Sequence, residues 1–102
     1  MELSHNHSFD ENEARERVRA LADYMQNRHG MQVTWNGTDA MHLAGKYTVV
    51  SIDCQVSLKP GCVHVLGKDP GMMLRGTAKK YVGSKLEAYL DPRVPLDQLP
   101  RS

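Results

Sequence analysis

The chain has 102 residues, of which 40% are hydrophobic and 25% charged, and its formal net charge at pH 7 is +1. These values are ordinary for a soluble globular protein, and the length suits one domain with one modest core. A net charge so close to zero disfavours a dedicated nucleic-acid-binding protein. No apolar run approaches the roughly 20 residues that a membrane-spanning helix needs.

The N-terminal stretch, MELSHNHSFDENEARE, lacks the basic and apolar segments of a secretory signal, so we expect a cytoplasmic protein. The two cysteines, Cys54 and Cys62, are expected to point to opposite faces of the sheet. Cys62 is also expected opposite Lys59, far along the ladder from Cys54, whereas a disulfide needs Cα atoms within about 7 Å. We therefore expect two free thiols, which suit a reducing compartment. A redox or nucleophilic role is the alternative, although no neighbouring residue is placed to lower a thiol pKa.

The first predicted elements are a strand at residues 2–7 and a helix directly after it. Ser8 and Glu11 have the spacing of a capping box, which marks the start of the helix. Gly30 is the predicted residue at which the helix stops. Apolar residues recur at helical spacing between these signals, and they form the predicted buried face: Ala14, Val18, Leu21, Ala22 and Met25.

The clearest alternation of apolar and polar residues, with a period of two, runs from Ala40 to Leu66. The face opposite the apolar one becomes polar after Val49, which indicates an antiparallel sheet covered on one side. Residues 31–35 have the same pattern, so we expect a meander of four strands. The predicted inward-facing residues of the main stretch are Met41, Val50, Ile52, Val56, Val63 and Val65.

Three turns set the expected strand registers. A three-residue loop after the strand at 31–35 is expected because it pairs Val33 with Met41, apolar against apolar. A tight turn at Gly45–Lys46 is expected to pair Met41 with Val50. Lys59–Pro60–Gly61 is predicted to close the last hairpin.

A second helix is predicted to begin at Asp69 as its N-cap, with Pro70 at the first helical position. Gly76 and Gly83 fall on nearly the same side of it, which favours close backbone packing there over a helix left loose. Asp91–Pro92 is expected to end the helix. The predicted apolar face consists of Leu74, Ala78, Tyr81, Val82, Leu86, Tyr89 and Leu90.

The order of elements, β-α-β-β-β-β-α, predicts an α+β fold in which a curved antiparallel sheet carries both helices on its apolar face. This order matches the TATA-box-binding-protein-like folds and is a reduced version of the helix-grip arrangement. We expect a single domain at residues 1–91 and a proline-punctuated, partly disordered tail at residues 92–102.

Catalytic and metal-binding motifs are weak or missing in the sequence. No nucleophile elbow, zinc-protease motif or phosphate-binding glycine loop occurs, so we assign no catalytic residue and no cofactor and favour a non-enzyme. His5 and His7 share a strand face and are weak candidates for a metal site. Zinc needs three or four ligands, and although His42, His64 or Cys62 could contribute, no spacing in the sequence requires it.

Apolar binding is the remaining possibility. Methionine adapts to varied apolar partners, although core filling is its more common use. A sheet wrapped on a helix can hold a pocket or leave an apolar strip uncovered. The candidate ligand-binding residues are Met41, Val50, Met73, Ala78, Tyr81 and Trp35.

A family resemblance rests on the first third of the chain. The runs His7-Ser8-Phe9 and Glu13-Ala14-Arg15, the helix ending near Gly30 and the run Val33-Thr34-Trp35-Asn36-Gly37 resemble the opening of the polyhydroxyalkanoic acid system proteins. These small bacterial proteins are named for association with polyester storage granules. The later strands and the C-terminal helix also correspond, so the resemblance covers about residues 1–90. It implies a non-enzymatic accessory role at or near a hydrophobic polymer surface.

Three hypotheses about function follow. The first is an accessory protein associated with polyhydroxyalkanoate granules through apolar surface or a small pocket. The second is a carrier of, or enzyme acting on, a small hydrophobic ligand held between the sheet and the C-terminal helix. The third is a homodimeric interaction module that pairs through an edge strand or the second helix.

Overall fold

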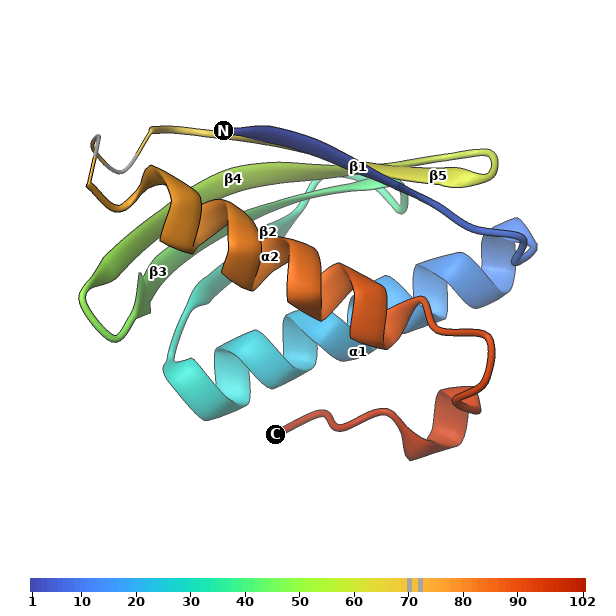
Figure 1. Ribbon diagram of the computed structural model, residues 1–102. Helices are drawn as coiled ribbons and strands as arrows, with labels where there is room; N and C mark the ends of the chain where they lie inside the picture. Colours follow the sequence, from blue (N-terminus) through green and yellow to red (C-terminus); the bar gives the residue numbers. More distant parts are fainter. Residues whose placement is uncertain (70, 72) are drawn as a thin grey trace.

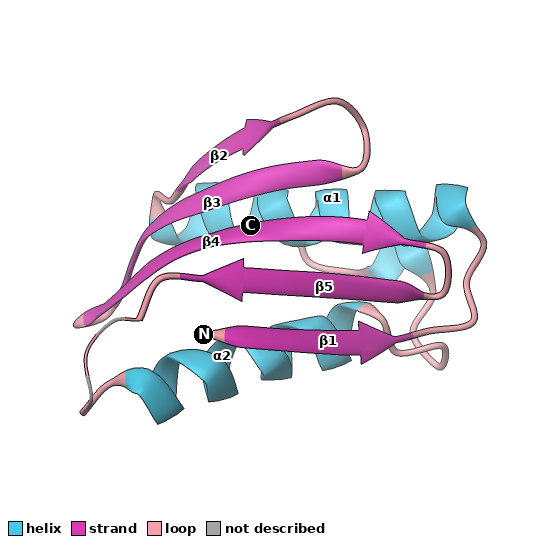
Figure 2. Cartoon of the chain, turned by 90° about the horizontal axis from the view of Figure 1, so that it is seen from above, coloured by secondary structure: helices cyan, strands magenta, loops and turns pink. Residues whose placement is uncertain are grey.

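A computed structural model describes residues 1–69, 71 and 73–102, and it contains one five-stranded antiparallel sheet with two α-helices on one face (Figures 1 and 2). The predicted α+β class and the curved sheet covered on one side are confirmed. In chain order the elements are β1 (Glu2–Asn6), α1 (Glu11–His29), β2 (Gln32–Trp35), β3 (Ala40–Tyr47), β4 (Val50–Lys59), β5 (Cys62–Gly67), α2 (Arg75–Tyr89) and the short 3-10 helix η1 (Leu96–Gln98).

The sheet has the strand order β1-β5-β4-β3-β2, so the N-terminal strand lies at one edge and β2 at the other. β1 pairs antiparallel with β5, and Leu3 lies opposite Val65. Hydrogen bonds extend this pairing at both ends. The Met1 amine donates to the Gly67 carbonyl, and the His7 amide donates to the Gly61 carbonyl, each at 2.9 Å.

The β2–β3 loop is longer than predicted. Val33 pairs with Leu43 rather than Met41, so the expected three-residue loop is wrong. The structure gives a physical reason, because the Arg15 side chain donates to the Thr38 carbonyl (3.2 Å) and to the Asp39 carboxylate (2.9 Å). These bonds hold a wider loop against α1. They join residues that are 23 and 24 positions apart, so turn preferences of neighbouring residues could not predict them.

The β3–β4 turn also lies elsewhere than predicted. Tyr47 pairs with Val50, and the turn falls at Thr48–Val49 instead of Gly45–Lys46. Gly45 is a mid-strand residue, and a Cβ atom added there would lie 2.7 Å from the Met31 Cγ. The glycine therefore permits close packing and does not mark a turn.

The β4–β5 turn is confirmed. Leu58 lies opposite Val63, and Lys59 lies opposite Cys62. Gly61 has a φ of 71°, a left-handed conformation that glycine adopts without a steric penalty.

Helix α1 begins two residues later than predicted. Asp10, and not Ser8, is the N-cap, since its side chain accepts a hydrogen bond from the Glu13 amide at 2.8 Å. Gly30 ends the helix in a left-handed conformation (φ 68°), as predicted. The predicted apolar face is buried against the sheet, as are the inward-facing strand residues Met41, Val50, Ile52, Val56, Val63 and Val65.

Helix α2 begins at Arg75, so the start predicted at Asp69 is wrong. The Asp69 side chain instead accepts from the Gly71 amide at 2.9 Å and pairs with Arg75, while the predicted Pro70 position lies outside the described residues. Gly76 and Gly83 both face open space, which contradicts the close packing expected there. The predicted buried residues Ala78, Val82, Leu86, Tyr89 and Leu90 do lie in the core.

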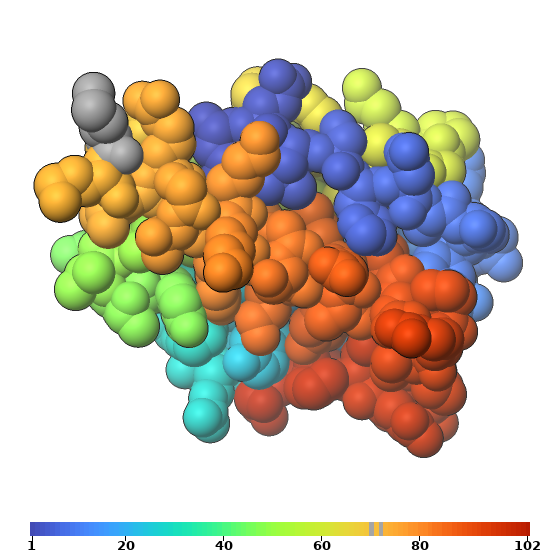
Figure 3. All heavy atoms as spheres, in the orientation of Figure 1, coloured from blue at the N-terminus to red at the C-terminus, as the bar shows by residue number. Residues whose placement is uncertain are grey.

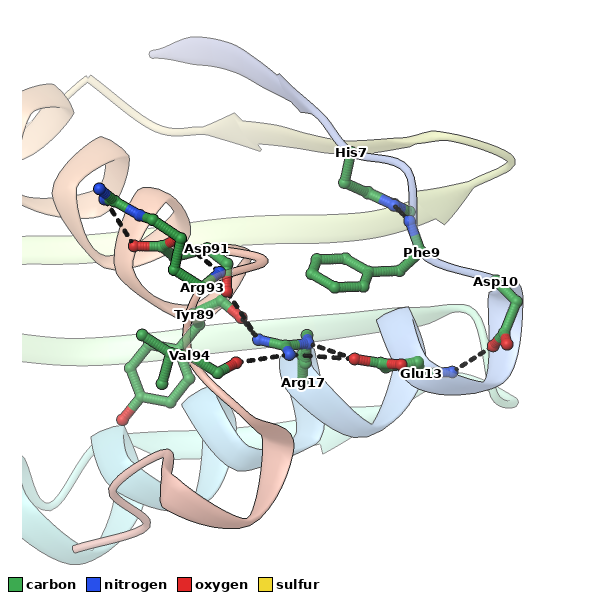
Figure 4. Close-up of polar contacts among 9 residues, drawn as sticks. All are labelled: His7, Phe9, Asp10, Glu13, Arg17, Tyr89, Asp91, Arg93 and Val94. Atoms are coloured by element: carbon green, nitrogen blue, oxygen red, sulfur yellow. Dashed lines mark hydrogen bonds and ion pairs between the residues drawn. The ribbon is translucent and has the colours of Figure 1, made fainter.

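Arg17 joins α1 to the end of α2 and to the tail (Figure 4). Its side chain is 2% exposed, and its guanidinium donates to the carbonyls of Tyr89 (3.1 Å), Asp91 (3.3 Å) and Val94 (2.7 Å). The residues after α2 therefore follow a defined path along α1. Further contacts of this tail are the Tyr89 hydroxyl with the Pro100 carbonyl, Arg101 with Asp23 and the Asn27 amide with the Arg101 carbonyl.

Replacing Arg17 with methionine tests this linkage. Arg17→Met keeps apolar volume but removes the donors to three carbonyls, so we expect a loss of about 2–4 kcal/mol in the free energy of unfolding. Urea denaturation measures this loss. Arg93→Met is the matched control, because the Arg93 side chain is 87% exposed and its removal should change stability by no more than about 0.5 kcal/mol. Equal effects of the two variants would contradict the role given to Arg17.

The two free thiols differ in burial, so we expect them to differ in reactivity. Cys54 is 2% exposed, and burial raises the pKa of its thiol to about 11, with a smaller contribution from the neighbouring Asp53 carboxylate. Cys62 is partly exposed on β5. We expect Cys62 to react with a chromogenic disulfide reagent in the native protein and Cys54 only after unfolding. Rapid labelling of Cys54 in the folded state would show that the β4 core opens readily.

Candidate functional site

The structure separates the six residues predicted to bind a ligand. Met41, Val50 and Ala78 are buried in the core with exposures of 0, 2 and 1%. The other three are more exposed, to different degrees. Trp35 and Tyr81 are partly buried and pack against the core, whereas Met73 is 94% exposed. A ligand-binding role for this set stays a prediction, and the two surface pockets identified in the described part of the chain are lined by other residues.

Both of these pockets flank the loop between β1 and α1. One holds about 80 Å³ and lies between this loop, α1 and the β4–β5 turn. The second holds about 330 Å³ and lies between the same loop and the end of α2. His7 and Phe9 line both pockets, so they form the wall between them. We call this region the His7–Phe9 site.

His7 has an unusual environment in this wall. Its Nδ1 accepts a hydrogen bond from the Phe9 amide at 3.2 Å, while its Nε2 is buried without a hydrogen-bond partner among the described residues. Burial, and to a lesser degree the nearby His5, lowers the pKa of His7 below its ordinary value of 6.5. The imidazole is therefore held neutral near pH 7.

Phe9 lies between His7 and Arg17 (Figure 4). The centroids of the His7 and Phe9 rings are 5.8 Å apart, and the Arg17 guanidinium carbon lies 4.1 Å from the Phe9 centroid. A cation above an aromatic ring is a favourable contact. The wall of the two pockets is thus braced by the same buried arginine that holds the tail.

Several of the residues that carry the family resemblance meet at this site. His7, Phe9, Ala14 and Arg15 all line the smaller pocket, although they come from a loop and a helix. The Arg15 side chain also reaches the β2–β3 loop that follows Trp35. Two sequence signals pointed to this site: the spacing of His7, Phe9 and the Ala14-Arg15 pair, and the choice of His5 and His7 as weak metal candidates.

His5 and His7, the weak metal candidates, both line the larger pocket. Within residues 1–69, 71 and 73–102, no three His, Cys, Asp or Glu side chains gather as a metal site would require. His42 and His64 instead pair with Asp53 (2.7 Å) and Glu2 (2.9 Å) on the uncovered face of the sheet. The hydrogen bond from His42 is the main cause that lowers the pKa of Asp53.

A second distinct surface lies at the far end of the molecule from this loop. The β3–β4 turn, which contains Val49, and the segment leading into α2, which contains Met73, form the same extremity in all three overall views (Figures 1, 2 and 3). Val49 is 76% exposed and Met73 is 94% exposed. We call this extremity the Val49–Met73 end. It comprises Val49, Met73 and four basic residues from the segment around Met73: Lys68, Arg75, Lys79 and Lys80. Met73 was among the residues predicted to bind a ligand, whereas Val49 was not.

Aromatic residues brace this end from inside. The rings of Tyr47, just before the β3–β4 turn, and Tyr81, on α2, are stacked with their centroids 3.8 Å apart. The His29 ring meets Tyr47 edge-on at 5.2 Å, and Lys85 lies 4.5 Å from the ring of Tyr24. Burial raises the pKa of Tyr81 to about 12, so its hydroxyl stays neutral and donates to the Met25 sulfur at 3.4 Å. The stack holds the turn against the helix.

Comparison with known protein families gives a match over most of the chain. The model of the family described as "Putative polyhydroxyalkanoic acid system protein" matches residues 1–94. The chain belongs to this family. No curated protein and no solved structure matched the chain. The family name suggests an association with polyhydroxyalkanoate systems, and the match covers both the His7–Phe9 site and the Val49–Met73 end. Among the described residues, no helix is both long enough and apolar enough to cross a membrane.

The lowered pKa of His7 predicts a pH dependence of stability. In the unfolded chain His7 takes up a proton near its ordinary pKa of 6.5, while in the folded chain it does so only at lower pH. The unfolded state therefore binds more protons as pH falls below 6.5, and His7 makes the protein less stable there. His7→Asn should reduce this loss, because asparagine does not titrate and its side-chain oxygen can still accept from the Phe9 amide.

Urea denaturation of both proteins at about pH 7.5 and at about pH 5.5 measures this effect. The loss of stability on acidification should be smaller for His7→Asn than for the unaltered chain. An identical loss in the two proteins would show that the His7 pKa is not lowered in the folded state.

Proposed function

We propose that this protein is a non-enzymatic accessory protein of polyhydroxyalkanoate storage, which contacts the hydrophobic polymer surface through the Val49–Met73 end. The observation that carries the proposal is the exposure of two large apolar side chains, 76% for Val49 and 94% for Met73, at one extremity of the fold. Membership of the family supplies the class of partner.

The chemistry of this end suits a polyester surface in contact with water. Full burial of a valine or methionine side chain is worth about 1.5–3 kcal/mol, so the two together give a useful but reversible attachment. Their basic neighbours are exposed, including Lys68 with 81% of its side chain accessible. Such side chains can stay hydrated or reach carbonyl and carboxylate groups while the apolar tips are covered.

The internal structure supports the same use. Val49 is in a tight turn in which Thr48 has a φ of 53°, and the preceding Tyr47 is stacked on Tyr81. The turn is therefore held in place before any contact is made, which lowers the entropic cost of binding. A contact surface that is already ordered favours attachment of the folded domain over unfolding on the polymer.

Sedimentation with purified polyhydroxybutyrate granules tests the proposal, with hydrophilic beads as the reference particle. The unaltered protein should sediment with the granules and stay in the supernatant with the beads. The double variant Val49→Ser/Met73→Ser should bind at least tenfold more weakly, which corresponds to about 1.4 kcal/mol. Circular dichroism and thermal unfolding show whether the variant remains folded.

The matched control is Leu66→Ser. Leu66 is 56% exposed, but it lies on β5 next to the inward-facing Val65 and so points to the opposite face of the sheet from the helices. This variant should bind granules as the unaltered protein does. Equal partitioning between granules and beads, or a loss of binding in Leu66→Ser as large as in the double variant, would overturn the proposal.

A further inference from the structure

The His7 imidazole carries a hydrogen-bond donor that the protein itself does not use. Because Nδ1 accepts from the Phe9 amide, the proton of the neutral ring lies on Nε2. This Nε2–H is buried and meets no acceptor among the described residues. Buried donors in folded proteins are almost always paired, so an unpaired one beside a pocket marks a position for an acceptor from outside.

The surroundings of His7 restrict the rest of the ligand. Phe9, Leu90 and Pro92 form the apolar part of the larger pocket, while Asn6 and Ser8 add polar groups to its lining. At about 330 Å³ this pocket is at the lower end of the range for small-molecule sites. A short aliphatic chain that carries one acceptor oxygen matches this lining.

The charges around the site favour a neutral ligand over an anion. The guanidinium of Arg15 is committed to Thr38, Asn12 and Asp39, and that of Arg17 to Glu13 and three carbonyls. In the smaller pocket Arg15 and Asp39 pair with each other, and the charge of Glu11 is balanced by that of Lys59. The described residues that line the larger pocket include no Asp, Glu, Lys or Arg. A carboxylate would therefore lose its hydration without meeting an excess of positive charge, whereas an uncharged carbonyl meets a donor.

We infer that the His7–Phe9 site binds a small neutral acyl compound, such as a short-chain ester, whose carbonyl oxygen accepts from the His7 Nε2–H. Since Nε2 is buried, the ligand reaches it only when the Phe9 ring leaves its contact with Arg17, and this movement joins the two pockets. The site is separate from the Val49–Met73 end, so it can be tested without reference to granule attachment.

Methyl butyrate is the probe, and butyrate is its anionic counterpart. Titration of the folded protein, followed through the NMR signals of the His7 and Phe9 rings, should give a saturable shift with methyl butyrate and a dissociation constant at least tenfold weaker with butyrate. His7→Asn should weaken binding of methyl butyrate at least tenfold, because it preserves the acceptor for the Phe9 amide and removes the Nε2–H.

His42→Asn is the matched control, since His42 pairs with Asp53 on the uncovered face of the sheet and lines neither pocket, and it should leave the affinity unchanged within a factor of about two. No saturable shift at millimolar methyl butyrate would overturn the inference. So would an unchanged affinity in His7→Asn, or tighter binding of butyrate than of the ester. His7→Asn should sediment with granules as the unaltered protein does, which separates this test from the test of granule attachment.

Discussion

The fold depends on one buried cation. Arg17 is the only charged side chain that is buried among the described residues, and all its donors are used within α1, α2 and the tail. The last carbonyls of a helix need donors and favour positive charge. Residues 86–89, the last turn of α2, contain no Lys or Arg, and Leu90 ends the helix without a left-handed cap. Helix α1 supplies the missing cation from 72 residues away in sequence.

This interaction also connects the scaffold with the His7–Phe9 site. Phe9 packs on the guanidinium face of Arg17, and His7 packs on Phe9. The position of the pocket wall therefore depends on the same side chain that fixes the C-terminal tail (Figure 4). At the other end of the molecule, Tyr47 and Tyr81 have the corresponding role, because their stack fixes the β3–β4 turn on α2. Each candidate surface is thus held by one interaction between elements that are distant in sequence.

The strand faces could be predicted from the sequence even though two of the three registers could not. The partner of Val33 moves from the predicted Met41 to Leu43, and that of Met41 moves from Val50 to Val56. Both shifts are an even number of residues. Because side chains alternate with a period of two, an even shift leaves every residue on its predicted face. Alternation thus predicts which face is buried, but the partner residue depends on the loop, and here the loops are held by Arg15 and by the stack of Tyr47 on Tyr81.

The sequence by itself determined the class of fold, the apolar faces of both helices, the stop at Gly30 and the turn at Gly61, because each of these follows from local periodicity or from a single residue's backbone preference. It also contained the residues of the family resemblance, without an indication that His7, Phe9 and Arg15 meet in space. Tertiary structure decided that meeting, the pairing of β1 with β5 and the path of the tail along α1. These features depend on contacts between residues far apart in the chain, which no local pattern records.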